Sequence, residues 1–225
     1  MDLPGHGRHA GRRGAWRFTL EAVEASIEGA AGADPPDLVG YSMGGRLALA
    51  YTVRNPGRVG RLVLESSSPG LETEAERRAR TEEDERLAGR IEAQGVEPFV
   101  AYWEALPLFE TQARLAEAVR ARQRAIRLGN SPHSLAAALR GLGTGALPSF
   151  WESLHEVRVP VLVVVGAMDR KFVEIGRQML PAFPDARLVE VPEAGHTVHL
   201  ERPEAWLEAV TAFLGEGRAH QPGSA

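Results

Sequence analysis

A serine lies at the centre of a short glycine-rich stretch, Gly40-Tyr41-Ser42-Met43-Gly44, between an apolar segment and a helix-like run. Strand, sharp turn and helix in this order are typical of a turn that holds a serine hydroxyl clear of a sheet. Because such a backbone is tight, we expect no room for a Cβ atom at either glycine. The backbone N–H of Met43 would then face the position where negative charge develops. We therefore predict that Ser42 is a nucleophile or a base.

A reactive serine needs a base, and the base needs an acid that orients it. Asp169 follows the strongest buried-strand signal of the chain, 159–166, and His196 follows the next expected strand, 187–191. The carboxyl ends of parallel strands meet at one edge of a sheet, where loops carry function. The sequence therefore predicts a Ser42–His196–Asp169 triad at this edge.

The sequence leaves alternatives for the acid and the base. Glu65 also ends an expected strand and competes for the role of the acid, while His199 competes for that of the base. Asp169 could instead cap the helix that follows it. No histidine and carboxylate pair has metal-ligand spacing, so we expect neither a metal nor another cofactor. The remaining histidines are expected to be solvated or structural: His6, His9, His133, His155 and His220.

Alternating strand and helix signals predict an α/β fold, a mostly parallel sheet with helices on both faces. Between about 72 and 147 strand signals disappear, and stretches rich in Arg and Glu predict an inserted helical cap. The expected parts are the first part of the core (1–71), the cap (72–147), the second part of the core (148–215) and a disordered tail (216–225). The expected helices are 16–32, 45–51, 73–94, 96–105, 111–128, 132–141, 172–182 and 203–214, and further strands are 36–39 and 61–65.

Composition narrows the classes of function. The 225 residues suffice for one substantial domain, and a net charge of −4 gives no global reason to expect nucleic-acid or anionic-membrane binding. The chain has no cysteine, which excludes disulfides and thiolate chemistry. No apolar run reaches the ~18 residues of a membrane span, and the start lacks a signal-peptide core, so we predict a cytoplasmic protein. Of 26 basic residues only Lys171 is a lysine, which hints at a specific role for it.

Several motifs together resemble a known family. Asp2-Leu3-Pro4-Gly5-His6-Gly7, the serine turn and Gly195-His196 resemble α/β hydrolases in general. Other motifs resemble, more narrowly, the 2-succinyl-6-hydroxy-2,4-cyclohexadiene-1-carboxylate synthase family of menaquinone biosynthesis. They are Ser68-Pro69-Gly70-Leu71, Leu106-Pro107-Leu108-Phe109, the stretch 139–145 and Asp169-Arg170-Lys171-Phe172. The resemblance covers nearly the whole chain.

The resemblance implies a lyase. The family removes a proton from a cyclohexene carboxylate and expels the enolpyruvyl group as pyruvate, which implies that Ser42 acts as a base. Such a substrate is a small anion with several carboxylates, and arginine binds carboxylates with two parallel donors. The resemblance implies these substrate-binding residues: Tyr41, Arg46, Arg80, Trp103, Arg127 and Lys171.

In one respect the chain differs from the family pattern. It starts at a point before which α/β hydrolases have two or three strands and a loop with a second oxyanion donor, so we expect these N-terminal strands to be missing. Met43 would then be left as the oxyanion donor. Two other functions stay open: a serine hydrolase of an ester or carbon–carbon bond, and a truncated, inactive fragment. An Arg-rich cap favours the lyase, since a neutral ester would favour an apolar cap. The oligomeric state is not predicted.

Overall fold

A parallel sheet forms the centre of the computed structural model, which describes residues 1–4, 6–7 and 18–216. Its strands, in sheet order, are β1 (Leu38–Tyr41), β2 (Leu62–Glu65), β3 (Val161–Gly166) and β4 (Ala186–Val191). All three pairings between them are parallel, and Leu62 is the partner of both Leu38 and Val161. The predicted α/β class with a parallel sheet is confirmed.

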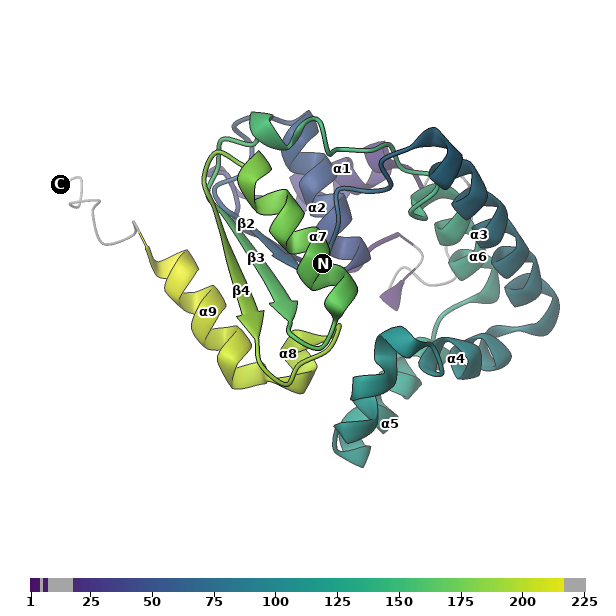
Figure 1. Cartoon of the computed structure of the whole chain (residues 1–225). Helices are drawn as coiled ribbons and strands as arrows, with labels where there is room; N and C mark the ends of the chain where they lie inside the picture. The colour runs from purple at the N-terminus through teal and green to yellow at the C-terminus, as the bar shows by residue number, and fades with distance from the viewer. Residues whose placement is uncertain (5, 8–17, 217–225) are drawn as a thin grey trace.

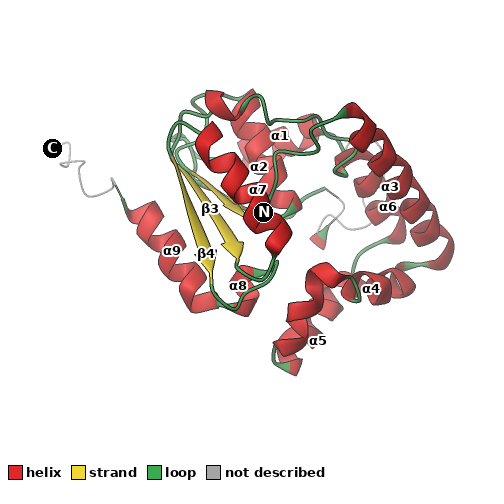
Figure 2. Cartoon of the chain, viewed as in Figure 1, coloured by secondary structure: helices red, strands yellow, loops and turns green. Residues whose placement is uncertain are grey.

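Helices cover both faces of this sheet (Figures 1 and 2). Side chains alternate between the faces along each strand. Leu62 and Leu64 pack with α2 and α7 on one face, whereas Val63 packs with α8 and α9 on the other. Helix α1 lies on the outer side of α2 in a further apolar cluster. The core helices are α1 (Leu20–Ala30), α2 (Met43–Arg54), α7 (Arg170–Met179), α8 (Val198–Glu201) and α9 (Pro203–Gly215).

The helical insertion lies between β2 and β3, and Figure 1 shows it to one side of the sheet. A capping box at Thr73 and Glu76 starts its longest helix, which contacts α6 along much of its length. Arg140 of α6 donates to both Glu85 and Glu92 of that helix, at 2.8–2.9 Å. The insertion comprises α3 (Glu74–Gln94), α4 (Val96–Glu104), the 3₁₀ helix η3 (Pro107–Arg114), α5 (Glu117–Leu128) and α6 (Pro132–Leu142).

Two sequence expectations differ from the structure. The expected helix 111–128 is interrupted, because its first residues belong to η3, Leu115 is extended and Ala116 also has a non-helical backbone. Phe109 and Gln112, which belong to η3, are buried, so contacts with distant parts of the chain determine where the helix is interrupted. The four-residue helix α8 was not expected. The expected tail falls, apart from Glu216, outside the described residues, as do Gly5 and the first two residues of the expected helix 16–32.

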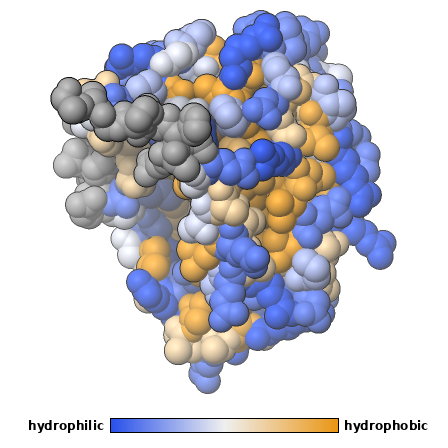
Figure 3. Space-filling view, turned by 90° about the vertical axis from the view of Figure 1, so that its left-hand side faces the viewer, coloured by the Kyte–Doolittle hydropathy of each residue, from blue (hydrophilic) through white to orange (hydrophobic). Residues whose placement is uncertain are grey.

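The described surface mixes polar and apolar residues. Figure 3 shows a band of hydrophobic residues bordered by hydrophilic ones on the face seen there. β1 is an edge strand of the described sheet, and Val39 in it is 47% exposed. No helix among the described residues is both long and apolar enough to cross a bilayer.

Candidate active site

The serine turn joins β1 directly to α2. Ser42 occupies the turn with φ 49° and ψ −113°, a strained conformation that non-glycine residues rarely adopt. A Cβ atom on Gly40 would lie 2.5 Å from the Cα of Gly45, so this glycine is required. The expectation for Gly44 is wrong: a Cβ there would meet nothing within 4 Å. Gly45 is the second crowded position, since its Cβ would lie 2.7 Å from that of Ser67.

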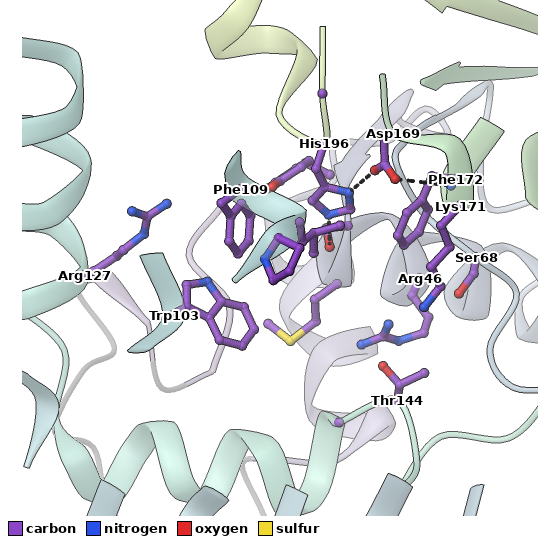
Figure 4. A pocket seen from close by; sticks show the side chains of 18 of the residues that line it. Arg46, Ser68, Trp103, Phe109, Arg127, Thr144, Asp169, Lys171, Phe172 and His196 are labelled. Carbon is purple, nitrogen blue, oxygen red and sulfur yellow. Dashed lines mark hydrogen bonds and ion pairs between the residues drawn. The ribbon is translucent and has the colours of Figure 1, made fainter. Parts of the chain in front are cut away.

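His196 lies within hydrogen-bond distance of both other residues of the predicted triad. His196 Nε2 is 3.1 Å from Ser42 Oγ, and His196 Nδ1 is 2.7 Å from Asp169 Oδ2 (Figure 4). His196 is 1% exposed and Asp169 is 9% exposed. Asp169 also accepts a hydrogen bond from the Phe172 N–H at 3.4 Å, so it orients the histidine and caps α7 at once. This arrangement can transfer a proton from the serine hydroxyl to the imidazole.

The competing acid and base form a separate pair. Glu65 is buried, and its carboxylate is 2.8 Å from His199 Nδ1 and accepts the His199 backbone N–H at 3.1 Å. The Tyr41 ring lies between the two histidines, with ring centroids 5.4 Å from His196 and 5.0 Å from His199. The geometry therefore favours His196 and Asp169 over the alternative pair.

The loop that carries His196 is held by a second carboxylate. Glu201 accepts the Gly195 N–H at 2.7 Å and the Thr197 N–H at 3.1 Å, one on each side of the histidine. The Phe172 ring centroid lies 4.6 Å from that of His196. The histidine is thus fixed by its backbone and by aromatic packing. Nothing in the local sequence identified Glu201, which lies at the end of the short helix α8.

A cavity of about 1250 Å³ opens over the triad between the core and the cap. This is larger than the ~300–1,000 Å³ of most small-molecule pockets. In Figure 4, Arg46 and Lys171 lie on one side of His196, and Arg127 lies on the other, beyond Trp103. Every substrate-binding residue predicted from the resemblance lines the cavity, and so does Met43.

The cations of this cavity differ in their partners. Arg80 donates from Nε to Asp84 at 2.9 Å, and Arg127 donates to Glu104 at 3.0 Å. The Nε of Arg46 is buried with no hydrogen-bond partner in the described part of the chain. Burial, and then the neighbouring charge of Arg80, lower the pKa of Arg46 to about 10. A buried donor without an acceptor identifies a place where an anion would be stabilised.

Two other predicted residues, Tyr41 and Trp103, contact neighbouring side chains. The sequence did not predict that His6 lines the cavity. The Tyr41 hydroxyl is 3.0 Å from Thr197 Oγ1, and burial raises the pKa of Tyr41. The Trp103 ring packs against Phe109 at 5.6 Å between centroids. His6, expected to be solvated or structural, lines the cavity. Among the residues that the structure describes, no group of three or more His, Asp or Glu side chains is arranged to hold a metal ion.

A parallel α/β core with a serine at a strand-to-helix turn and His and Asp at the same sheet edge defines a protein of the serine-triad α/β class. The model of one family, described as "Alpha/beta hydrolase family", matches residues 1–209. The chain belongs to this family, as its motifs predicted.

Proteins similar to this chain indicate a narrower group within the family. A Bacillus subtilis protein named "Putative 2-succinyl-6-hydroxy-2,4-cyclohexadiene-1-carboxylate synthase" is 49% identical over 177 residues, which are 79% of this chain and 65% of that protein. A protein of Enterobacter sp. (strain 638) with the name 2-succinyl-6-hydroxy-2,4-cyclohexadiene-1-carboxylate synthase is 31% identical, covering 95% of this chain and 80% of that one. The solved structure of MenH from S. aureus matches with a TM-score of 0.89 and 36% identity, covering 96% of this chain and 82% of that chain. The narrower resemblance read from the cap motifs is confirmed.

Proposed function

We propose that this protein is a carbon–oxygen lyase of menaquinone biosynthesis. It would eliminate pyruvate from 2-succinyl-5-enolpyruvyl-6-hydroxy-3-cyclohexene-1-carboxylate to give 2-succinyl-6-hydroxy-2,4-cyclohexadiene-1-carboxylate. The observation that carries the proposal is a triad with a serine–histidine distance of 3.1 Å beneath a cavity lined by several cations. The names of the similar proteins support the same reaction.

The triad supplies the base for this elimination. Ser42 gives its proton to His196, and its oxygen then takes a proton from a ring carbon of the substrate. The electron pair of the broken C–H bond forms a new ring double bond, the double bond already in the ring shifts by one carbon toward the leaving group, and the C–O bond to the enolpyruvyl group breaks. The leaving group is the enolate of pyruvate, which takes a proton to become pyruvate. Asp169 stabilises the imidazolium that forms in the first step.

The substrate is a small molecule with several carboxylates, and the cavity has cations on both sides of the base. Arg46 would bind one carboxylate through its unpartnered Nε. Arg80 and Lys171 line the same cavity. Arg127 would bind a second carboxylate beside the flat face of Trp103. The Met43 N–H, at the first residue of α2, would stabilise negative charge on an oxygen near Ser42. A cytoplasmic location and the use of no cofactor belong to the same proposal.

Pyruvate release from the enolpyruvyl cyclohexene substrate tests this function. We expect release by the wild-type protein and its loss in Ser42→Ala. Ser26→Ala is the matched control, because Ser26 lies on α1 and its hydroxyl donates to Ala22 within that helix. Wild-type protein that is folded, as shown by a cooperative melt, and releases no pyruvate would contradict the proposal.

A serine hydrolase is the second candidate, because the same triad can attack a carbonyl. The solved structure of a thermophilic esterase from Thermogutta terrifontis matches with a TM-score of 0.76 and 26% identity. A fluorophosphonate probe and a series of simple esters separate the two functions. Rapid labelling of Ser42 together with ester turnover would favour the hydrolase, whereas poor labelling with pyruvate release favours the lyase.

A further inference from the structure

The backbone of Ser42 is held on both sides by the end of the neighbouring strand. Its N–H donates to the carbonyl of Glu65, the last residue of β2, at 2.8 Å. Its carbonyl accepts the Ser67 hydroxyl at 3.0 Å, in addition to the Arg46 N–H at 3.0 Å within α2. Because a carbonyl can only accept, the Ser67 hydroxyl must be the donor. Both lone pairs of the Ser42 carbonyl are therefore engaged.

Burial and packing fix the Ser67 side chain in this direction. Ser67 is 2% exposed and lies two residues beyond the end of β2. The residue before it, Ser66, turns the chain with φ 45° and donates its N–H to Val164 of β3 at 2.9 Å. A Cβ atom on Gly45 would lie 2.8 Å from Ser67 Oγ, so the hydroxyl packs against the glycine of the serine turn.

The hydrogen bond from Ser67 orients the peptide group between Ser42 and Met43. This peptide bond is trans and planar, so its C=O and its N–H point in opposite directions. A hydroxyl that holds the Ser42 carbonyl on one side therefore holds the Met43 N–H on the other. Met43 lines the cavity as the first residue of α2, a helix without a side-chain cap. Its N–H needs no intrahelical acceptor and can serve an oxygen of a bound molecule.

The strained backbone of Ser42 gives this support a purpose. Its φ of 49° and ψ of −113° form a conformation that persists only where its surroundings hold it. Within the described part of the chain, its hydrogen bonds with Glu65 and Arg46 join main-chain groups. The bond from Ser67 comes from a side chain. The type of residue at position 67 therefore decides whether the Ser42 carbonyl has its second partner.

We propose that Ser67 is a positioning residue, whose hydroxyl fixes the Ser42–Met43 peptide group so that the Met43 N–H faces the oxygen on which charge develops. The catalytic consequence rests on the proposed lyase function. In that reaction the serine oxygen carries negative charge while it acts as a base, and the leaving group departs as an enolate. A fixed donor beside Ser42 stabilises such charge more than a mobile one, because it needs no reorientation during the reaction.

Ser67→Ala tests the proposal, because it removes the hydroxyl and leaves the Cβ atom in place. Loss of an oxyanion donor costs ~10²–10³ in rate, and here the donor stays but loses its support. We therefore expect kcat for pyruvate release to fall about tenfold with KM little changed. Rates are measured well below the melting temperature of the variant, so that the protein is folded. A merely structural role would lower the melting temperature and leave kcat unchanged.

Ser66→Ala is the matched control. Ser66 adjoins Ser67 and is 0% exposed, and its hydroxyl has no hydrogen-bond partner among the described residues. The same chemical change there removes an unsatisfied buried group, so kcat should keep its wild-type value and the melting temperature should not fall. A loss of kcat in Ser66→Ala as large as that in Ser67→Ala would overturn the proposal, because the hydrogen bond to Ser42 would then not be the cause.

One NMR signal, recorded without substrate, separates this inference from the proposed function. Met43 is the only methionine that follows a serine in the sequence. Protein with isotope-labelled serine carbonyls and methionine nitrogens therefore gives a single carbonyl–amide correlation, that of the Ser42–Met43 bond. We expect the carbonyl signal to move upfield in Ser67→Ala, where it loses a hydrogen bond, and to move much less in Ser66→Ala.

The two measurements together distinguish the outcomes. If the signal moves while folded wild-type protein releases no pyruvate, the lyase proposal fails and the positioning of the peptide group by Ser67 stands. An unchanged signal in Ser67→Ala would refute the positioning whatever the activity. A signal that moves in an active protein whose kcat is unchanged would overturn the catalytic role of Ser67.

Discussion

Replacing Arg46 by methionine should stabilise the protein while it removes function. Burial, and then the charge of Arg80, lower the pKa of Arg46 to about 10, well below that of a free guanidinium. Each pKa unit corresponds to ~1.4 kcal/mol, so a lowering of this size means that the charged form costs at most about 3–4 kcal/mol. The Arg46 side chain is partly exposed, which reduces that cost, and an unpaired buried donor alone costs ~1–3 kcal/mol. We therefore expect Arg46→Met to raise the free energy of unfolding by about 1–3 kcal/mol.

The gain in the free energy of unfolding expected for Arg46→Met depends on pH. The folded chain releases the Arg46 proton near pH 10, whereas the unfolded chain keeps it up to the higher pH typical of a free guanidinium. The unfolded state therefore binds more protons between these values, and the stability of the wild-type protein rises with pH across that window. Below pH 10 the cost of the buried charge is present in full. Measurements near neutral pH thus show the whole effect of Arg46→Met.

Thermal and denaturant unfolding measure the effect. For a domain of this size 1 kcal/mol corresponds to a shift of ~2–4 °C, so the melting temperature should rise by ~2–10 °C. Arg54→Met is the matched control on the same helix, because Arg54 is paired with Glu21 and Glu24 at the surface and its loss should be neutral or slightly destabilising. A multi-carboxylate anion should raise the melting temperature of the wild-type protein and have little effect on Arg46→Met.

One result would refute the reasoning about Arg46. If Arg46→Met lowers the free energy of unfolding more than Arg54→Met does, then the cation has a stabilising partner in the folded protein. The unpartnered Nε would then not indicate an anion site, and the assignment of Arg46 to substrate binding would lose its physical basis. A stabilised variant that still releases pyruvate at the wild-type rate would refute the functional half alone.

Three further predictions concern the triad, its loop and the cap. Asp169→Asn should lower pyruvate release by about 10⁴-fold without a matching loss in melting temperature, because the imidazole is no longer held in the correct tautomer; steady-state kinetics and melting of one preparation check this, and a loss below tenfold would contradict it. Glu201→Gln leaves one loop amide facing an NH₂ group, so kcat should fall about tenfold with KM little changed, a split that separate kcat and KM measurements reveal. Arg140→Met should lower the melting temperature in dilute buffer, and the difference should shrink in 1 M salt, where charges are screened beyond ~3 Å; a difference independent of salt would show that the contact is not electrostatic.

The sequence predicted most elements because their signals are local. Strand β3 is an uninterrupted apolar run, and the helices of the cap are set by composition and by the capping box at Thr73. The positions of Ser42, Asp169 and His196 follow from the rule that parallel strands end at one edge. Pattern and topology were therefore enough to place three side chains that are 27 to 154 residues apart along the chain.

What the sequence did not show depends on contacts between distant segments. Gln112 meets Thr197 across 85 residues, and no periodicity marks either one. The crowding at Gly45 comes from Ser67 on the neighbouring strand end, so the serine motif alone pointed to Gly44 instead. The broken helix 111–128 has helical composition throughout, and only the burial of Phe109 and Gln112 explains the break.

The triad by itself does not decide between a nucleophile and a base; the charge of the cavity does. Arg80 and Arg127 each have a carboxylate partner in the free protein, which holds their guanidinium groups in place at little cost. Arg46 lines the same cavity as Ser42 and its Nε has no hydrogen-bond partner among the described residues, so the nearby charge of Asp84 offsets its buried charge only in part and a bound anion would offset it further. A neutral ester would leave that cost uncompensated in the complex. The distribution of partners among the arginines therefore favours a substrate whose own carboxylate completes the site beside the base.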